Sequence, residues 1–366
     1  MKVPFNDLGQ QHRFLKNEVE ESFKKIIESS SFVRGEEVFT FEKKFAEINN
    51  SKNCISCANG TDALYIAMRA LNVKNGDEVI VPAHSWISTS ETVTQAGGKI
   101  IFCDTKKDTF TIDPSEIKRK ITAKTVGIIP VHLYGHPADM DEINAIAKEN
   151  NLWVIEDCAQ AHLALYKDRL IGTFGDIATF SFYPGKNLGA MGDAGAIITD
   201  NDELAVKMQK IARHGGIKKG IHEIEGINSR MDTLQAAVLN IKLKHLEEWT
   251  KSRRKIAQIY KDLLRNNEKI TLPHVDDNCN PVWHLYVIKH DERDELAKSL
   301  NEAGIQTNIN YPIALPFLDA YEHLELSEND MPNAFYNQSR ILSIPIFPEM
   351  REDQISYVAE MIHRYA

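Results

Sequence analysis

The sequence contains no long hydrophobic run. None of its 366 residues lies in an apolar stretch approaching the roughly 20 residues that a membrane helix needs. The first residues, Met1–Asn6, also lack the apolar stretch of a signal peptide. These two absences predict a protein without a membrane partner and favour a cytoplasmic location.

Cysteine is scarce, and the five cysteines are scattered and odd in number, which suits a reducing compartment. Cys54 and Cys57 form a CxxC pair, but a zinc ribbon needs a second pair and the sequence has none. Their segment has the pattern of a strand, in which residues three apart face opposite sides. We therefore expect buried core cysteines and no metal site.

Positive charge is also in short supply. The chain has 43 Lys and Arg against 52 Asp and Glu, which gives a formal charge of −9. Because phosphate backbones are bound by basic patches, this balance argues against a nucleic-acid partner. A hydrophobic content of 43% and a charged content of 26% are typical of a globular protein with a large core.

Several nucleotide and metal motifs are missing. A P-loop ending at Gly185-Lys186 would need glycine at 180 and Ser or Thr at 187, but Phe180 and Asn187 stand there. No GxGxxG sequence opens a strand–helix unit, so nicotinamide binding is unsupported. Neither HExxH nor an EF-hand loop occurs.

What the sequence does contain is a series of short apolar runs, which we interpret as strands: 54–57, 78–81, 100–103, 126–131, 153–156, 178–181 and 195–199. Stretches of helical periodicity separate most of them, including 60–72, 139–150 and 202–213. Apolar strands that alternate with helices predict a largely parallel sheet covered on both faces. The last two runs are close enough in sequence to pair antiparallel.

The character of the chain changes near residue 245. A long helix is expected from Ser229, with an apolar face that continues to Trp249. A strand at 283–289 and helices at 291–303 and 353–365 follow. We therefore predict a large domain over 1–245 and a smaller α+β domain over 246–366.

Lys186 lies in a Pro-Gly turn directly after the apolar run 178–181. A lysine held there can lose solvation, so that its pKa falls and its amine becomes a nucleophile. Upstream, the run 153–156 is followed by Asp157, and Gln160 comes three residues later. An amine that forms a Schiff base and an acid that pairs with a pyridinium nitrogen are what pyridoxal 5′-phosphate (PLP) requires of a protein.

The segment Asn59–Leu64 follows a predicted strand and opens a helix, where free N–H groups suit a phosphate. Gly60 allows close approach, Thr61 adds a hydroxyl, and Ser181 is a second candidate ligand. The same residues also fit a turn with a helix cap.

Two further side chains follow predicted strands. Trp86 could stack on a planar cofactor or simply pack in the core. His132 follows the run 126–131 and is expected to point toward the site; it could be catalytic, but a hydrogen-bonded structural histidine is the simpler interpretation.

Together these residues resemble the DegT/DnrJ/StrS family of PLP-dependent nucleotide-sugar aminotransferases. The likeness extends over nearly the whole chain, and several motifs in order are far more specific than any one alone. The segments that carry it are 3–8, 32–35, 59–64, 131–135, 156–160, 181–190, 226–231, 310–312 and Pro345.

The resemblance implies the α/β fold of type I PLP-dependent transferases, which is aspartate-aminotransferase-like, with a mostly parallel seven-stranded sheet in the large domain. It also implies a homodimer with shared active sites. Lys186 would hold the cofactor and transfer protons, and Asp157 would keep the pyridine nitrogen protonated. The other implied cofactor contacts are Gln160 at the ring hydroxyl, Trp86 at the ring face, and Gly60, Thr61, Ser181 and Asn228 of the partner subunit at the phosphate.

The implied reaction is ping-pong through pyridoxamine phosphate. Glutamate gives up its amino group and leaves as 2-oxoglutarate, and a nucleotide-linked keto sugar then accepts the amine. The sugar is expected near Tyr183, under the loop 308–313 that contains Asn310 and Tyr311.

The resemblance does not determine which carbon of the sugar is aminated. Segments 132–139 and 184–195 look most like members that act at C3 of 3-keto-6-deoxy sugars on dTDP. Asn310 departs from this pattern, because many such members have His before Tyr-Pro, and Pro316 stands where His often follows Leu. C3 is favoured and C4 is open.

Three alternatives come from other classes. A PLP-dependent sugar dehydratase has this fold, but such relatives replace the lysine with His, so Lys186 argues against it. A regulatory or binding protein could keep the aminotransferase body without turnover, although no basic helix-turn-helix occurs in the first 50 residues. An aminotransferase for another acceptor, such as an inosose, is the third.

Overall fold

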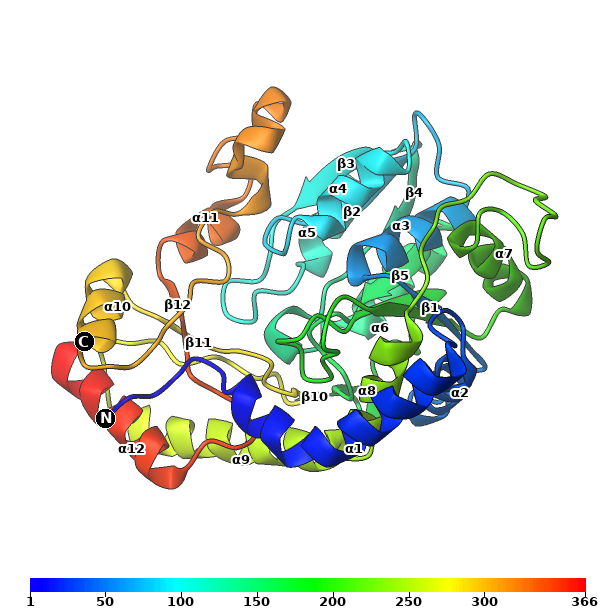
Figure 1. Cartoon of the computed structure of the whole chain (residues 1–366). Coiled ribbons are helices and arrows are strands. Elements are labelled where there is room, and N and C mark those ends of the chain that lie inside the picture. The colour runs from blue at the N-terminus through cyan, green and yellow to red at the C-terminus, as the bar shows by residue number, and fades with distance from the viewer.

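A computed structural model describes all 366 residues, and its centre is one seven-stranded sheet (Figure 1). The strand order is β1-β9-β8-β5-β4-β2-β3. The strands are β1 (Asn53–Cys57), β2 (Glu78–Pro82), β3 (Lys99–Cys103), β4 (Thr125–Ile128), β5 (Trp153–Asp157), β8 (Ile177–Ser181) and β9 (Gly195–Thr199). Strands β3, β2, β4, β5 and β8 are parallel, while β9 is antiparallel to both β8 and β1. The predicted, mostly parallel sheet and its antiparallel pair are confirmed.

Both faces of the sheet are covered, because successive strand residues point to opposite sides. In β2, Ile80 belongs to a cluster of 34 buried residues, whereas Val79 and Val81 belong to a second cluster of 29. The first cluster is completed by α2 (Glu36–Ile48), α5 (Pro114–Lys120), α6 (Met140–Glu149) and α8 (Thr233–Leu243), and the second by α3 (Gly60–Ala70), α4 (Ser88–Gln95) and α7 (Asp202–Ala212).

The CxxC pair divides between these two clusters. Cys54 is part of the first cluster and Cys57 of the second, and both are buried and free. Burial raises the pKa of each thiol, so both remain protonated hydrophobes. The interpretation as core cysteines is confirmed.

The expected single helix from Ser229 is wrong in one respect. It is two helices, α8 and α9 (Leu246–Leu264), which run in different directions in Figure 1. At the junction, Lys244 N–H donates to the Ile241 carbonyl and His245 N–H donates to the Lys242 carbonyl. Each acceptor is three residues earlier in the chain, as in a 3₁₀ turn, and this tighter turn ends α8. The two halves keep the same apolar spacing, so periodicity could not reveal the break.

A second group of elements packs beside the sheet and contains the C-terminal residues (Figure 1). Strands β11 (Tyr286–Lys289) and β12 (Ile341–Ile344) pair antiparallel, so the strand expected over 283–289 is shorter than predicted. The surrounding helices are α9, α10 (Arg293–Glu302) and α12 (Glu352–Tyr365), whereas α11 (Pro332–Gln338) places Ala334 in the second cluster of the large sheet. Val3 from the N-terminal segment packs in the same core cluster and bridges to Ile305.

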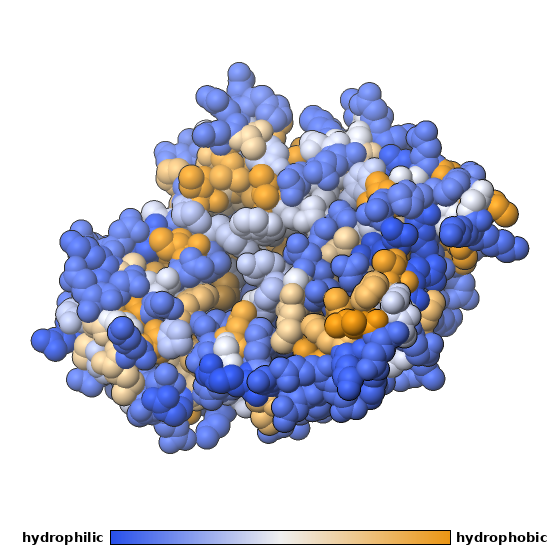
Figure 2. Space-filling view, in the orientation of Figure 1, coloured by the Kyte–Doolittle hydropathy of each residue, from blue (hydrophilic) through white to orange (hydrophobic).

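The remaining elements are short, apart from α1 (Leu8–Ser29), which packs against α8. They are a three-stranded sheet of β6 (Leu165–Tyr166), β7 (Arg169–Leu170) and β10 (Cys279–Asn280), and the 3₁₀ turns η1 (Leu133–Gly135), η2 (Leu315–Phe317) and η3 (Asp319–Leu324). No helix combines the length and the apolar character that a membrane span requires. Figure 2 shows a largely hydrophilic surface, with hydrophobic residues gathered near the middle of the view, above α1.

Candidate active site

A cavity of about 890 Å³ opens at the carboxyl ends of the parallel strands, where ligands bind in open α/β sheets. It brings together nearly all the residues singled out in the sequence. These are Gly60, Thr61, Trp86, Asp157, Gln160, Ser181, Tyr183, Lys186, Asn310 and Tyr311. Asn228 is exposed and lies outside the cavity of its own chain.

Lys186 is half-buried in the cavity wall. The turn after β8 is closed by Lys186 N–H, which donates to the carbonyl of Tyr183 at 2.8 Å. Burial lowers the pKa of the Lys186 amine to about 8, and the negative charge of Asp157 only partly opposes this shift. An amine with that pKa is about one tenth uncharged at pH 7, which an ordinary lysine is not.

Asp157 is the last residue of β5 and is buried. Its Oδ1 accepts the Ala159 N–H at 3.1 Å, and its Oδ2 accepts the Thr89 hydroxyl at 3.1 Å. Burial raises the pKa of Asp157, while these two hydrogen bonds and the nearby Lys186 favour the ionised form. A buried carboxylate held in this way is well suited to face a protonated ring nitrogen.

The contribution of Thr89 was not predicted from the sequence. Because its hydroxyl proton points at Asp157, the Ser85 hydroxyl at 2.9 Å must be the donor to Thr89. Both residues are buried and line the cavity. The only sequence signal is a Ser- and Thr-rich stretch that forms a buried helix, and helices of such composition also occur without any role in a site.

Gln160 is fixed by two hydrogen bonds. Its Oε1 accepts the Tyr134 N–H at 2.6 Å, and its Nε2 donates to the Tyr311 hydroxyl at 3.0 Å. The first contact determines which end of the amide carries the NH₂ group, so one N–H of Gln160 remains for a ligand.

An anion cradle lies at the start of α3. Asn59 caps the helix by accepting the Asp62 N–H at 2.8 Å, which leaves other first-turn N–H groups free. Gly60 is required there, because a Cβ at this position would lie 2.7 Å from Cβ of Ser181. Thr61 Oγ1 lies 2.6 Å from the hydroxyl of Ser88 and completes a polar rim.

Aromatic residues form the mouth of the cavity. Trp86 and Tyr183 are 58% and 60% exposed, which leaves their rings accessible to a bound molecule. The rings of Trp86 and Tyr311 lie 5.4 Å apart, so they enclose the mouth from one side. Asn310 contacts the β12 strand through Oδ1, which accepts the Ser343 hydroxyl at 2.9 Å.

The sequence profile of the DegT/DnrJ/EryC1/StrS aminotransferase family matches residues 14–363. This chain belongs to that family. It is 42% identical to the dTDP-3-amino-3,6-dideoxy-alpha-D-galactopyranose transaminase of Aneurinibacillus thermoaerophilus, and the match covers 99% of both chains. It is also 42% identical to the pleiotropic regulatory protein of Geobacillus stearothermophilus, over 100% of this chain and 99% of the relative. The solved structure of S. venezuelae DesV in complex with a ketimine intermediate has a TM-score of 0.97 and 38% identity, with 100% and 98% of the two chains covered.

The protein is therefore a PLP-dependent aminotransferase with the fold that the resemblance implied. The residues of its cavity fit this cofactor. The cradle at Gly60 suits the phosphate, the Asp157 carboxylate suits the ring nitrogen, and the Lys186 amine suits the carbonyl carbon.

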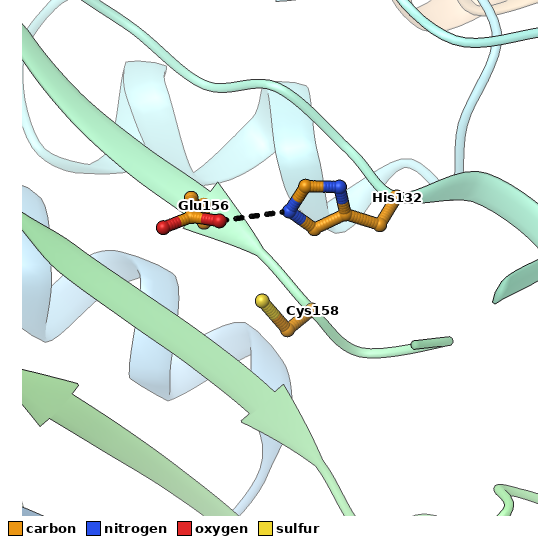
Figure 3. Close-up of side chains that lie close together, drawn as sticks. All are labelled: His132, Glu156 and Cys158. Carbon is orange, nitrogen blue, oxygen red and sulfur yellow. Dashed lines mark hydrogen bonds and ion pairs between the residues drawn. The ribbon is translucent and has the colours of Figure 1, made fainter. Parts of the chain in front are cut away.

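His132 of the aminotransferase is a structural residue, and it does not point into the cavity. Figure 3 shows its ring directed at Glu156, with Nε2 3.1 Å from Oε2 and both side chains fully buried. Its Nδ1 accepts the Ala138 N–H at 2.9 Å, so the proton is on Nε2 and is donated to the carboxylate. The structural interpretation is confirmed, and the expected orientation toward the site is wrong.

Proposed function

We propose that this enzyme transfers an amino group from glutamate to the C3 keto group of a 6-deoxy sugar linked to dTDP. The observation that carries the proposal is the coincidence of a cavity whose residues fit PLP with strong similarity, over the full chain, to a transaminase of a dTDP-3-amino-3,6-dideoxy sugar. C4 of the sugar is the alternative position, and glutamate is the donor expected from the family.

Bound PLP supplies an electron sink and carries the amino group between the two substrates. The protein supplies position and proton transfer. Asp157 would place negative charge beside the ring nitrogen of the bound cofactor, and Thr89 and Ala159 N–H fix the direction of its carboxylate. The free N–H of Gln160 is available to the ring hydroxyl.

Lys186 is the group that moves the substrate proton. Burial has lowered the pKa of its amine to about 8, so a larger fraction of the amine is uncharged near neutral pH and available to accept a proton. A general base with a pKa near the working pH both takes up and returns a proton efficiently. The tight turn after β8 holds the lysine at the cavity wall, where its amine would face a bound cofactor.

The sugar binds at the aromatic mouth. Tyr183 and Tyr311 offer apolar ring faces to a sugar and hydroxyls to its polar groups, and Asn310 lies beside them. The loop 308–313 is the segment expected to close over the sugar. Enclosure there would exclude water during amine transfer, which protects the reactive cofactor from hydrolysis.

The enzyme acts as a homodimer in this proposal, with Asn228 of each chain reaching the phosphate in the partner subunit. Support comes from the surface of α1 and the segment that follows it. Large apolar side chains are exposed there, and the most exposed are Phe14 at 70%, Ile27 at 61% and Val33 at 51%. An exposed apolar surface of this kind is typical of a protein interface.

The test uses the purified protein with PLP and two acceptors, dTDP-3-keto-6-deoxyglucose and dTDP-4-keto-6-deoxyglucose. We expect glutamate to bleach the visible band of the bound cofactor, and only the 3-keto sugar to restore it with formation of an amino sugar. Lys186→Ala should bind cofactor yet lose turnover, while Lys244→Ala, at an exposed lysine, should be unchanged.

Each unexpected result would overturn a different part of the proposal. Restoration by the 4-keto sugar alone would move amination to C4, and bleaching with neither sugar active would point to an acceptor such as an inosose. Wild-type turnover in Lys186→Ala would refute the assignment of the lysine. Light scattering that gave a monomer would refute the shared active site.

A regulatory role without turnover is the second candidate, because a relative of 42% identity is named a pleiotropic regulatory protein. The retained amine of Lys186 and the open cavity favour catalysis. A cofactor band that glutamate and other amino donors leave unchanged would favour the regulatory role.

A further inference from the structure

A second cluster of metal-ligand side chains lies outside the cofactor cavity. His136, which follows η1, lies near Asp276, in the loop before β10, and near Cys279, the first residue of β10. The donor atoms of these three side chains all lie within 4.8 Å of one another. None of the three lines the cofactor cavity, and catalysis uses none of them.

One ring nitrogen of His136 has a lone pair available for a cation. It is 7% exposed, and its Nδ1 lies 2.8 Å from the carbonyl oxygen of Pro137, to which only an N–H can donate. The lone pair is therefore on Nε2, whose one polar contact is the long 3.4 Å approach of Asp276 N–H. Metal-bound histidines commonly donate their other ring N–H to a backbone carbonyl in this way.

The burial of His136 also favours a ligand. A ring nitrogen that is nine-tenths buried and whose one polar contact is long lacks the hydrogen bond that water would have supplied. A bound cation would satisfy it.

Cys279 and Asp276 complete the set from one short segment. The Cys279 thiol is half-buried and lies 3.8 Å from the Pro137 carbonyl, so it shares that carbonyl with His136. His274 lies next to the cluster, with Nε2 3.1 Å from Oδ1 of Asp276, and its exposed ring is free to turn.

We propose that His136, Asp276 and Cys279 bind a zinc-like divalent cation, with His274 as the fourth ligand. Imidazole, thiolate and carboxylate are the ligands that Zn²⁺ uses, and four protein ligands are typical of a closed structural site. Binding releases the thiol proton of Cys279 to solvent as the sulfur–metal bond forms. Tetrahedral bond lengths place ligand atoms roughly 3.5 Å apart, a spacing that donor atoms within 4.8 Å of one another can reach by small side-chain shifts.

The ion would link two segments that are far apart in the sequence. One is the residue after η1, and the other is the loop between α9 and β10. The loop residues His274 and Asp276 are partly exposed, so little else fixes their side chains. The expected consequence is greater thermal stability, with no direct part in amine transfer.

Another cluster has a similar composition, but its histidine and carboxylate already have hydrogen-bond partners. His132, Glu156 and Cys158 also lie within 4.8 Å of one another (Figure 3). Both ring nitrogens of His132 are used, and the Glu156 oxygens already accept several N–H groups. Neither His132 nor Glu156 has a lone pair left for a cation, in contrast to Nε2 of His136.

The test uses tag-free holoenzyme, stripped with EDTA and dialysed against Co²⁺ and then Zn²⁺. We expect one tightly bound ion per chain, the intense visible bands of tetrahedral Co²⁺ with a thiolate ligand, and a rise in the thermal midpoint with Zn²⁺. Cys279→Ser and His136→Asn should each weaken binding at least about tenfold and remove the intense bands. His323→Asn, at an exposed histidine on η3, should change neither.

Absence of binding by the wild-type protein would overturn the proposal. So would equal binding by the two ligand variants, or the faint bands of an octahedral ion. The visible band of bound PLP and the thermal midpoint in EDTA establish that each variant is folded, so a loss of metal cannot be mistaken for a loss of structure.

Discussion

Glu156 offers the sharpest test of how the site is supported. Its side chain is fully buried and accepts four hydrogen bonds: Oε1 from Phe174 N–H and Gly175 N–H, each at 2.7 Å, and Oε2 from Gly172 N–H at 2.7 Å and His132 Nε2 at 3.1 Å. Four donors and no acceptor face the group, so the ionised carboxylate is the form that fits.

Glu156→Gln keeps the shape and converts one oxygen to an NH₂ group. Whichever way the amide turns, two of the four donors then face another donor, and their N–H groups lose their partners. Each hydrogen bond to a charged group contributes about 1.5–3 kcal/mol, and the relief of burying a neutral amide instead of a charge offsets part of the loss. The expected net destabilisation is about 2–4 kcal/mol.

The assay is urea unfolding followed by tryptophan fluorescence, together with a thermal scan. The midpoint should fall by several degrees, while Glu149→Gln, at an exposed glutamate of α6, should match the wild type. His132 cannot rescue the variant by changing tautomer, because its Nδ1 must accept the Ala138 N–H. A Glu156→Gln protein as stable as the wild type would refute the assignment of donors and acceptors.

Three further predictions concern the cofactor. Thr89→Val removes the hydroxyl that contacts the buried carboxylate at the end of β5, so the dissociation constant for PLP should rise about fivefold to tenfold by equilibrium dialysis, with Thr94→Val as an exposed control. Gly60→Ala places a methyl group 2.7 Å from Cβ of Ser181 inside the anion cradle, so PLP affinity should fall at least about tenfold; unchanged affinity would place the phosphate elsewhere. Only the uncharged amine of Lys186 can capture PLP, so the capture rate of the cofactor-free enzyme should rise about tenfold per pH unit below its pKa of about 8 and level off above it; a pH-independent rate would contradict the lowered pKa.

The sequence was most informative where a residue's role follows from its place after a strand. Lys186, Asp157 and Ser181 all stand at or beyond the carboxyl end of a strand, and parallel strands bring such ends to one edge of a sheet. The apolar runs identified those strands because buried parallel strands are apolar throughout. The cavity residues therefore converge as the sequence predicted.

The sequence was least informative where several side chains share one proton or one donor. Thr89 reaches Asp157 across 68 positions of chain, and no local pattern links the two. The direction of His132 likewise depends on the Ala138 N–H and on Glu156 together. The break between α8 and α9 was missed for a different reason, because their apolar spacing continues through it.

The sequence alone determined the sheet, the nature of the cofactor and ten of the 30 residues that line the cavity, because the apolar runs and the chemistry of Lys186 and Asp157 lie in short segments. Only the tertiary structure decided which donor meets which acceptor. It lowered the pKa of Lys186 by burial, turned His132 toward Glu156, and brought His136 to Cys279 across the fold. Protonation and hydrogen-bond direction depend on every neighbour within a few ångströms, and those neighbours come from distant parts of the chain.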